Sequence, residues 1–171
     1  MIEGFAKALG MKVLIAERKG VHTSTHRKGR TPFSTALQRC SVLVIACPLD
    51  NTSLNMITQT EFRLMQPHSI VINVARGGVL DEAALVQALK EGWIAGAASG
   101  VFAVEPATKT SSPFTREEVP NLTLSPHIAW YADASMEKLQ ETVKVTVEGF
   151  VGGRVVNCVT GSCVPVCGKG A

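Results

Sequence analysis

Short, mostly apolar runs recur along the chain and alternate with segments that have helical patterning. Three of them are Met11–Glu17, Val42–Cys47 and Ile70–Ala75, and each is followed by a charged residue or a proline. Runs of this length and composition are typical of parallel strands buried on both faces. Two further strands are expected at Ile94–Phe102 and Leu122–Ser125. The alternation predicts an α/β protein with a parallel sheet that helices cover on both faces.

Helix signals lie between these runs. Helices are expected at Ile2–Leu9 and Thr31–Cys40. Thr58 and Glu61 have the spacing of a capping box, and Asp81 can cap the helix that follows it. A long last helix is predicted from an apolar stripe at Met136, Leu139, Val143, Val147 and Phe150.

Composition sets limits on the class of protein. Apolar residues make up 46% of the 171 residues and charged residues 18%, which excludes extensive disorder. No apolar run approaches the roughly 20 residues that a membrane span needs, and no basic segment precedes an apolar stretch at the start. We expect a soluble, cytoplasmic protein with no membrane partner. Residues 1–151 should form one domain and residues 152–171 a flexible tail containing Cys and Gly.

Basic residues concentrate between Arg18 and Arg30, although the formal net charge is only +3. A solvated loop is expected there, with attraction of phosphate or nucleic acid as the alternative. No aromatic residues stand among these charges, so stacking on single strands is unsupported. We therefore expect no nucleic-acid partner.

The chain has five cysteines, an odd number. Cys40 and Cys47 flank an apolar run and are expected to be reduced core thiols. The three tail cysteines lack the fourth ligand and the close pairs of a zinc site. No metal is therefore expected, and a reducing compartment with reduced tail thiols is predicted for Cys158, Cys163 and Cys167.

Polar side chains that could take part in binding or catalysis follow three successive predicted strands. They are Arg76, which precedes two glycines, then Glu105, and then His127. The carboxyl ends of parallel strands are where open α/β sheets bind ligands. An arginine can grip a carboxylate with two parallel hydrogen bonds, and a glutamate beside a histidine selects one tautomer for proton donation. Each residue alone has an ordinary structural explanation, but the three together suit a substrate with a carboxylate beside a carbonyl or hydroxyl.

Several stretches cover most of residues 1–150 and are characteristic: GMKVLIAER, CPLDNTSLNMI, VINVARGGVLDEAALVQALKEGWIAGAA, VFAVEP and NLTLSPHIAW. With these stretches the chain resembles the D-isomer-specific 2-hydroxyacid dehydrogenases, close to glycerate dehydrogenase or hydroxypyruvate reductase. The resemblance implies a Rossmann-like domain, NAD or NADP as cofactor, a small carboxylate-bearing substrate and a homodimer. It also implies that Arg76 binds the substrate carboxylate and carbonyl, that His127 donates the proton in reduction, and that Glu105 is its partner.

The resemblance further implies a set of cofactor-binding residues. Glu17 matches the acidic position that hydrogen-bonds the adenosine ribose and favours NAD, while the neighbouring Arg18 leaves NADP open. Pro48 and Leu49 match a loop that lines the cofactor. The residues that border the nicotinamide side are Asn73 and Ala75.

The sequence departs from the family in three ways. It contains no Gly-x-Gly-x-x-Gly loop, which in the family cradles the pyrophosphate, and we expect this loop and its strand to be missing before Met1, together with the substrate domain. Gly100 stands where the family usually has an aspartate on the cofactor side. The slot of the missing strand should be filled by direct pairing of the runs at 11–17 and 42–47, by residues 155–156 or 164–166, or by another chain.

Three functions are compatible with these departures. The first is an NAD(P)-dependent reductase of small 2-oxo acids, acting alone or within a larger protein. The second is a cofactor-independent enzyme, such as an isomerase, cyclase or lyase, that uses Arg76, Glu105 and His127 for acid–base chemistry. The third is a non-catalytic binding scaffold.

Overall fold

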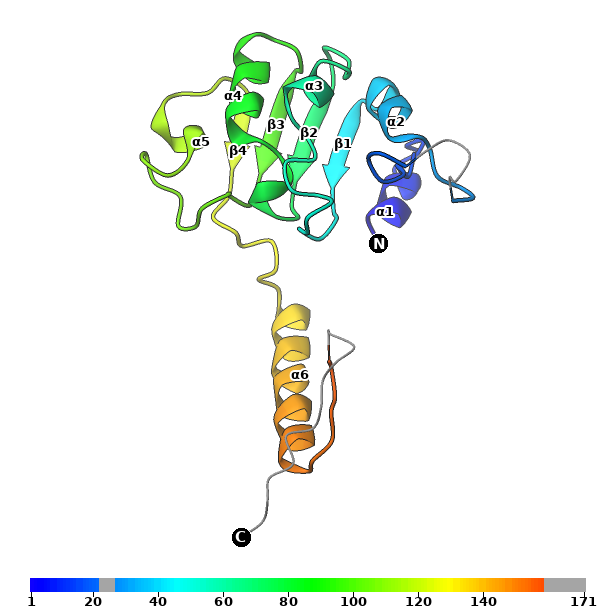
Figure 1. The fold of residues 1–171 in the computed structure, drawn as a ribbon, viewed down its shortest axis with the longest axis vertical. Helices are drawn as coiled ribbons and strands as arrows, with labels where there is room; N and C mark the ends of the chain where they lie inside the picture. The colour runs from blue at the N-terminus through cyan, green and yellow to red at the C-terminus, as the bar shows by residue number, and fades with distance from the viewer. Residues whose placement is uncertain (22–26, 159–171) are drawn as a thin grey trace. The chain divides into compact units, whose positions relative to one another are not determined.

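The computed structural model describes residues 1–21 and 27–158. The chain divides into two compact units, Met1–His127 and Ile128–Ala171. The first unit contains a β-sheet with its helices, and the second contains one long helix, α6, at Asp133–Val151 (Figure 1). All of the residues singled out above for chemistry belong to the first unit.

The first unit is built on a four-stranded sheet in which every neighbouring pair is parallel. The strands follow their order in the sequence, with Val42 opposite Ile70 and Ile70 opposite Gly96. The predicted parallel α/β fold is therefore confirmed. The strands are β1 (Val42–Ile45), β2 (Ile70–Asn73), β3 (Gly96–Ser99) and β4 (Leu122–Leu124).

The predicted capping residues begin helices where expected. Thr58 and Glu61 form a reciprocal capping box at the start of α3, and the Asp81 carboxylate accepts the backbone N–H groups of Ala83 and Ala84 at the start of α4. The helices of this unit are α1 (Ile2–Ala8), α2 (Phe33–Arg39), α3 (Gln59–Phe62), α4 (Glu82–Lys90) and α5 (Pro113–Arg116), with a 3-10 turn at Gly77–Val79.

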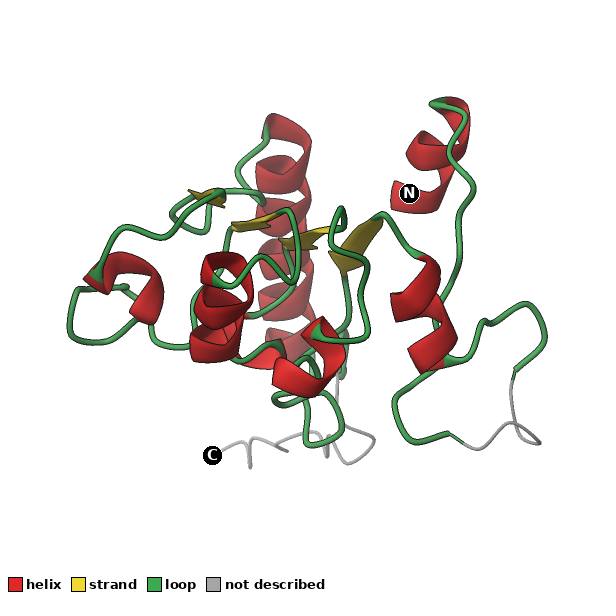
Figure 2. Cartoon of the chain, turned by 90° about the horizontal axis from the view of Figure 1, so that it is seen from above, coloured by secondary structure: helices red, strands yellow, loops and turns green. Residues whose placement is uncertain are grey.

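The hydrophobic core lies between the sheet and the helices α3, α4 and α5. Figure 2 shows α3 and α4 on the same side of the strands. Val71 of β2 packs in one cluster with Phe62, Leu85 and Phe114 from these helices. Each such side chain stabilises the fold by about 1.5–3 kcal/mol through its burial. This core fixes the positions of the loops that leave β2 and β3.

The segment Met11–Glu17, predicted as a strand, is not part of the sheet. Its only ladder contact among the described residues is an isolated bridge between Ala16 and Thr31. The Glu17 N–H donates to the Thr31 carbonyl at 2.8 Å, and the Thr31 N–H donates to the Ile15 carbonyl at 2.9 Å. An apolar extended segment becomes a strand only where a neighbouring backbone supplies hydrogen-bond partners, and β1 does not supply them here.

The outer edge of β1 is consequently not paired by any described residue of this chain. Direct pairing of residues 11–17 with β1, one of the expected ways to fill the slot, is wrong. Residues 155–156 do not form a strand either, and residues 164–166 lie outside the described residues. Of the expected occupants, residues 164–166 and another chain therefore both stay predictions.

In the described part of the second unit, residues that follow α6 pack back against it. Gly149 leaves room for Val156, since a Cβ at Gly149 would lie 2.5 Å from a methyl carbon of that valine. The Asn157 side-chain amide donates to the Thr146 hydroxyl at 2.9 Å. No helix in the described part of the chain is long and apolar enough to cross a membrane.

The cysteines differ between the two units. Cys40 and Cys47 are free thiols, as expected, and burial raises the pKa of both. Cys158, in contrast, is disulfide-bonded, so the expectation of a reduced thiol is wrong at that position. Cys163 and Cys167 lie outside the described residues.

The Asp81 cap provides a test of the fold. Asp81→Ala removes the acceptor for two N–H groups of α4, so the free energy of unfolding should fall by about 1 kcal/mol. Urea unfolding measures this as a lower midpoint at unchanged slope. Asp81→Asn keeps an acceptor oxygen and should retain most of the stability. Equal losses in both variants would contradict this role.

Candidate active site

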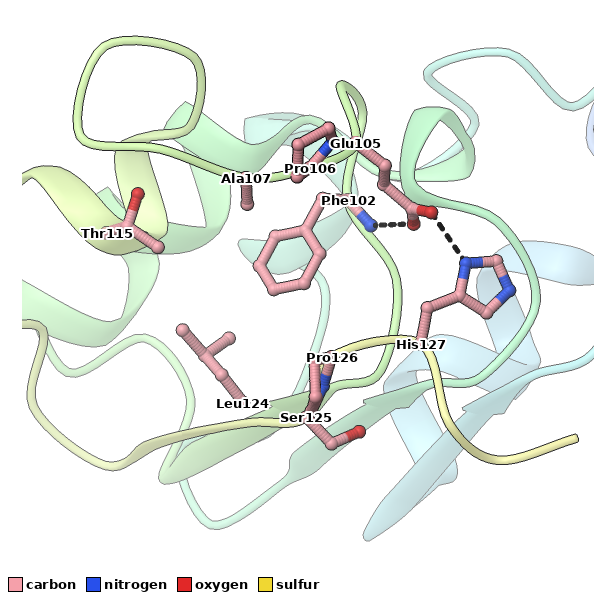
Figure 3. A pocket seen from close by; sticks show the side chains of 9 residues that line it. All are labelled: Phe102, Glu105, Pro106, Ala107, Thr115, Leu124, Ser125, Pro126 and His127. Atoms are coloured by element: carbon pink, nitrogen blue, oxygen red, sulfur yellow. Dashed lines mark hydrogen bonds and ion pairs between the residues drawn. The ribbon is translucent and has the colours of Figure 1, made fainter. Parts of the chain in front are cut away.

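Glu105 and His127 form a close pair at the carboxyl end of the sheet. The His127 Nδ1 lies 2.6 Å from a carboxylate oxygen of Glu105, and both side chains are a little over one third exposed. The second Glu105 oxygen accepts the backbone N–H of Phe102 at 3.0 Å. Figure 3 shows both interactions at the rim of a cavity. The predicted partnership of these two residues is thus present in the structure.

The hydrogen bonds to Glu105 define its protonation state. The hydrogen bond from His127 is the main cause that lowers the Glu105 pKa, followed by the bond from the Phe102 N–H, with smaller contributions from the charges of His127 and Arg76. The carboxylate is therefore ionised at neutral pH and can only accept hydrogen bonds. His127 must donate from Nδ1, so its Nε2 is the atom that can release or take up a proton.

The backbone at His127 is unusual. His127 has φ = +52°, in the left-handed region that only a few per cent of non-glycine residues adopt, with asparagine, aspartate and histidine enriched among them. Its N–H donates to the Ser125 carbonyl at 3.0 Å across Pro126. This tight turn, directly after β4, aims the imidazole back towards Glu105. Such conformations cost of order 1–3 kcal/mol and cluster at functional sites.

Arg76 follows β2 and is exposed. Together with Pro48, Leu49 and Ala75 it lines a cavity of about 710 Å³ that also includes Cys47. Three of the residues predicted to contact the cofactor are thereby brought together with the predicted substrate-binding arginine. The guanidinium donates one hydrogen bond to its neighbour's carbonyl, that of Ala75, at 2.7 Å.

Asn73 organises the turn that carries Arg76. Its side-chain amide donates to the Arg76 carbonyl at 3.0 Å, and its side-chain oxygen accepts the Ala75 N–H at 3.1 Å. The side chain is buried, so both of its polar groups are occupied in holding the backbone. The Asn73 carbonyl accepts the N–H of Gly100 at 3.0 Å, which ties this turn to the end of β3.

Gly100 is buried between two neighbouring loops. A Cβ added there would lie 3.2 Å from the Ser125 hydroxyl, so the neighbouring side chain occupies part of the space that an aspartate would need.

Glu17 and Arg18 lie at the end of the segment outside the sheet. The Glu17 carboxylate is buried and accepts the backbone N–H groups of Arg18 and Arg27 at 2.9 and 3.0 Å. The Arg27 guanidinium also donates to it, and this hydrogen bond is the main cause that holds the Glu17 pKa far below its ordinary value. Glu17 is thus an ionised acceptor whose oxygens are already engaged.

A second cavity, of about 630 Å³, lies beside the Glu105–His127 pair. It is mainly apolar, and Figure 3 shows Phe102 and Leu124 on one side with the carboxylate–imidazole pair at the other. Within the described residues no group of three or more His, Cys, Asp or Glu side chains is placed to hold a metal ion.

Two loops of the site touch through their backbones. A Cβ at Gly77 would lie only 1.9 Å from the carbonyl carbon of Phe102 and 2.2 Å from the nitrogen of Ala103. Only glycine fits this contact, which joins the loop of Arg76 to the loop of Glu105.

Sequence reasoning missed one buried group near the site. Glu82, the first residue of α4, is 5% exposed, and its carboxylate accepts the Ala103 N–H at 2.6 Å. The available signal was an acidic residue placed directly after the cap Asp81 and before an apolar helix face.

The contact at Gly77 predicts that substitution by alanine destabilises the protein much more at Gly77 than at the adjacent Gly78. Gly77→Ala forces a methyl group against backbone that cannot rotate away, so we expect a loss of about 1–3 kcal/mol or more in stability. In Gly78→Ala the new methyl meets a methyl carbon of the Leu49 side chain at 3.3 Å. That side chain can move, so this control should lose clearly less. Similar urea midpoints for the two variants would refute the contact.

The Glu105 carboxylate gives a pH-dependent prediction. Because its pKa is lowered in the folded state, its stabilising contribution is present above the unfolded value of about 4.3 and is lost as the pH falls through the folded value. Thermal melts should therefore show a difference between wild type and Glu105→Gln at pH 5.5 that shrinks towards pH 2.5. Glu118→Gln, at an exposed glutamate, is the control. A difference that does not change over this range would contradict the ion pair.

The comparisons with known proteins agree on one family. The family described as D-isomer specific 2-hydroxyacid dehydrogenase, NAD binding domain, matches residues 2–129. Glycerate dehydrogenase of Methylorubrum extorquens is 38% identical over 154 residues, which are 90% of this chain and 47% of that protein. Glyoxylate reductase of Thermococcus litoralis is 34% identical over 155 residues, covering 88% of this chain and 45% of that protein.

Solved structures lead to the same assignment. The NADPH-dependent glyoxylate/hydroxypyruvate reductase of Sinorhizobium meliloti, in complex with citrate, superposes with a TM-score of 0.73 at 27% identity, over 91% of this chain and 48% of that one. The NAD-complexed D-isomer specific 2-hydroxyacid dehydrogenase of Lactobacillus delbrueckii ssp. bulgaricus shares the fold, with a TM-score of 0.72 at 24% identity over 90% of this chain and 50% of that one. The chain spans about half the length of these relatives. It belongs to the D-isomer-specific 2-hydroxyacid dehydrogenase family, and the part of the family that it matches is the NAD-binding domain.

Proposed function

We propose that this chain supplies the cofactor-binding and proton-donating part of an NAD(P)-dependent reductase of small 2-oxo acids, of the glycerate or hydroxypyruvate type. The observation that carries the proposal is the pair of Glu105 and His127, 2.6 Å apart, with the charge of Arg76 close enough to lower the Glu105 pKa. An anion-binding cation beside a carboxylate–imidazole pair suits a substrate whose carboxylate adjoins the reacting carbonyl.

The residues present fit the nicotinamide half of such a cofactor. The cavity next to Arg76 is concave and is lined by Pro48, Leu49 and Ala75 without a competing carboxylate. The 171 residues include no Gly-x-Gly-x-x-Gly loop for the pyrophosphate. When bound, the nicotinamide would supply the hydride to the carbonyl carbon.

Side chains of this chain would bind the substrate, donate the proton and orient the imidazole. Arg76 would hold the substrate carboxylate by two parallel hydrogen bonds, releasing its present bond to the Ala75 carbonyl. His127 would donate the proton from Nε2 to the carbonyl oxygen, because Nδ1 is committed to Glu105. The ionised Glu105 would stabilise the imidazolium before transfer and fix the orientation of the ring.

The choice between NAD and NADP depends on Glu17 and its neighbours. An ionised carboxylate accepts hydrogen bonds from ribose hydroxyls and repels a 2′-phosphate, which favours NAD. The guanidinium of Arg27 and the side chain of Arg18 are the groups that could offset this repulsion. A bound ribose would have to replace donors that Glu17 already has.

A cofactor-independent acid–base enzyme is the second candidate. The observation that favours it is Gly100, which removes an acidic side chain from the cofactor side while Arg76, Glu105 and His127 are all present. Such an enzyme would move protons on a 2-oxo or 2-hydroxy acid without transferring hydride.

A homodimer and a cytoplasmic location are also proposed. The outer edge of β1, which no described residue pairs, supports self-association, because unpaired strand edges favour pairing with another chain. The free thiols of Cys40 and Cys47 support a reducing compartment, whereas the disulfide of Cys158 argues against it.

Nucleotide binding and turnover test the first proposal. NADH and NADPH are titrated by fluorescence, and binding tighter than about 100 μM should raise the melting temperature by mass action. Reduction of glyoxylate or hydroxypyruvate should fall about 100- to 10,000-fold in His127→Gln, with unchanged nucleotide affinity. Arg76→Gln should act through the substrate and raise its KM. Arg116→Gln, at an exposed arginine of α5, is the matched control.

Two results would contradict the reductase proposal. One is the absence of binding of either nucleotide, and the other is turnover that His127→Gln leaves unchanged. Exchange of the C3 protons of hydroxypyruvate in D₂O, observed by NMR without nucleotide and lost in His127→Gln, would support the second candidate instead.

A further inference from the structure

The position of Glu105 depends on the four-residue segment that contains it, residues 102–105, here called the Glu105 loop. This loop has no regular secondary structure. The Glu105 carboxylate can bind the His127 ring and the Phe102 N–H at the same time only if the backbone of Phe102 is correctly placed. What holds the first half of the loop therefore controls the geometry of the pair.

Glu82 is the polar side chain that binds the backbone in the first half of the Glu105 loop. One of its oxygens accepts the Ala103 N–H at 2.6 Å, and the other accepts the hydroxyl of Ser112 at 2.6 Å. Glu82 and Ser112 are 5% and 0% exposed. A buried carboxylate is costly unless it is hydrogen-bonded, and here each oxygen has a strong partner.

These bonds connect three separate parts of the first unit. Glu82 is the first residue of α4, and Ser112 is the N-cap of α5, where its hydroxyl accepts the Phe114 N–H. The Phe102 ring packs edge-on against that of Phe114 at 6.2 Å. The Glu105 loop is thus fastened to α4 by the Glu82 carboxylate and to α5 by an aromatic contact.

We propose that Glu82 is a positioning residue for the Glu105–His127 pair, acting through the Ala103 N–H to set the backbone from which Glu105 reaches the imidazole. The importance of this positioning by Glu82 for catalysis rests on the proposed function. Its effect on the geometry of the pair does not, because that effect can be measured without substrate or nucleotide.

Loss of the Glu82 charge and loss of its hold on the Glu105 loop should shift the Glu105 pKa in opposite directions. This difference makes the proposal testable. Removing the negative charge of Glu82 makes a neighbouring carboxylate easier to ionise and so lowers the Glu105 pKa. Releasing the Glu105 loop weakens the hydrogen bonds from His127 and the Phe102 N–H, which lower that pKa. Loss of positioning therefore raises the Glu105 pKa.

Two variants of Glu82 separate these effects in the complete 171-residue chain. Glu82→Asp keeps the charge but is one methylene shorter, so it cannot reach the Ala103 N–H and Ser112 together. Glu82→Gln removes the charge but keeps the length, an acceptor oxygen for Ala103 and an amide donor for the Ser112 hydroxyl. The readout is the pH titration of the Glu105 carboxyl carbon by NMR, assigned with Glu105→Gln.

The expected result is a rise of the Glu105 pKa by about half a unit or more in Glu82→Asp and no rise in Glu82→Gln. The NMR signature of the Nδ1–H of His127, a proton held by a carboxylate, should weaken only in the aspartate variant. Glu91→Ala, at an exposed glutamate that follows α4, should leave both signals unchanged.

Ser112→Ala controls for stability, since it removes a buried partner of Glu82 but leaves the bond to the Ala103 N–H in place. It should lower the unfolding midpoint with little change in the Glu105 titration. Three outcomes would overturn the proposal: an unchanged Glu105 pKa in Glu82→Asp, equal rises in Glu82→Asp and Glu82→Gln, or a rise in Ser112→Ala as large as that in Glu82→Asp. A failed reductase assay combined with the expected titrations would refute the proposed function alone.

Discussion

The backbone contact between Gly77 and the Phe102–Ala103 peptide is the constraint on which the site depends. The loops after β2 and β3 carry side chains of opposite charge, and each would be free to move if held only by its own strand. Because Gly77 has no side chain, the two backbones meet at a distance that no Cβ would allow. The spacing between the arginine and the carboxylate is thereby set by main-chain atoms, which are the least adaptable part of the protein.

Hydrogen bonds within each loop then fix the conformation of the loops that the Gly77 contact brings together. Asn73 uses both ends of its buried amide to shape the turn before Arg76, and Glu105 uses one carboxylate oxygen on the backbone of its own loop. Groups a few residues away in sequence thus orient part of the site, while Glu105 is also bound by His127 and its loop by Glu82, each more than twenty positions away. The backbone of these loops is held before any ligand binds, which is the kind of preorganisation that electrostatic catalysis requires, although the Arg76 side chain would have to release the Ala75 carbonyl to bind a carboxylate.

Features with a local cause could be predicted from the sequence. The capping box of Thr58 and the cap at Asp81 require only residues three or four positions apart, and both are present. The strands at 42–45 and 70–73 lie inside the apolar runs that predicted them. The pairing of Glu105 with His127 was predictable because consecutive parallel strands deliver their carboxyl ends to one edge.

Features that depend on distant partners could not be predicted in the same way. Met11–Glu17 has the composition of a strand, but a strand also needs a neighbouring backbone, and the run itself does not encode one. Glu82 looks like an ordinary solvated residue at a helix start, and its burial becomes evident only when Ser112 and Ala103 fold over it. The hydrogen bond from Arg27 to Glu17 likewise joins residues ten positions apart in the sequence.

The order of the strands has a consequence for local motion. In the described sheet β2 and β3 are flanked on both sides, whereas β1 and β4 form the edges. Local opening requires the least free energy where the fewest backbone hydrogen bonds must break. Arg76 and Glu105 follow the two inner strands, while His127 follows β4, an edge strand of three residues. His127, the proposed proton donor, is thus attached to an edge of the sheet, where fraying is easiest, whereas Arg76 and Glu105 are attached to its inner strands.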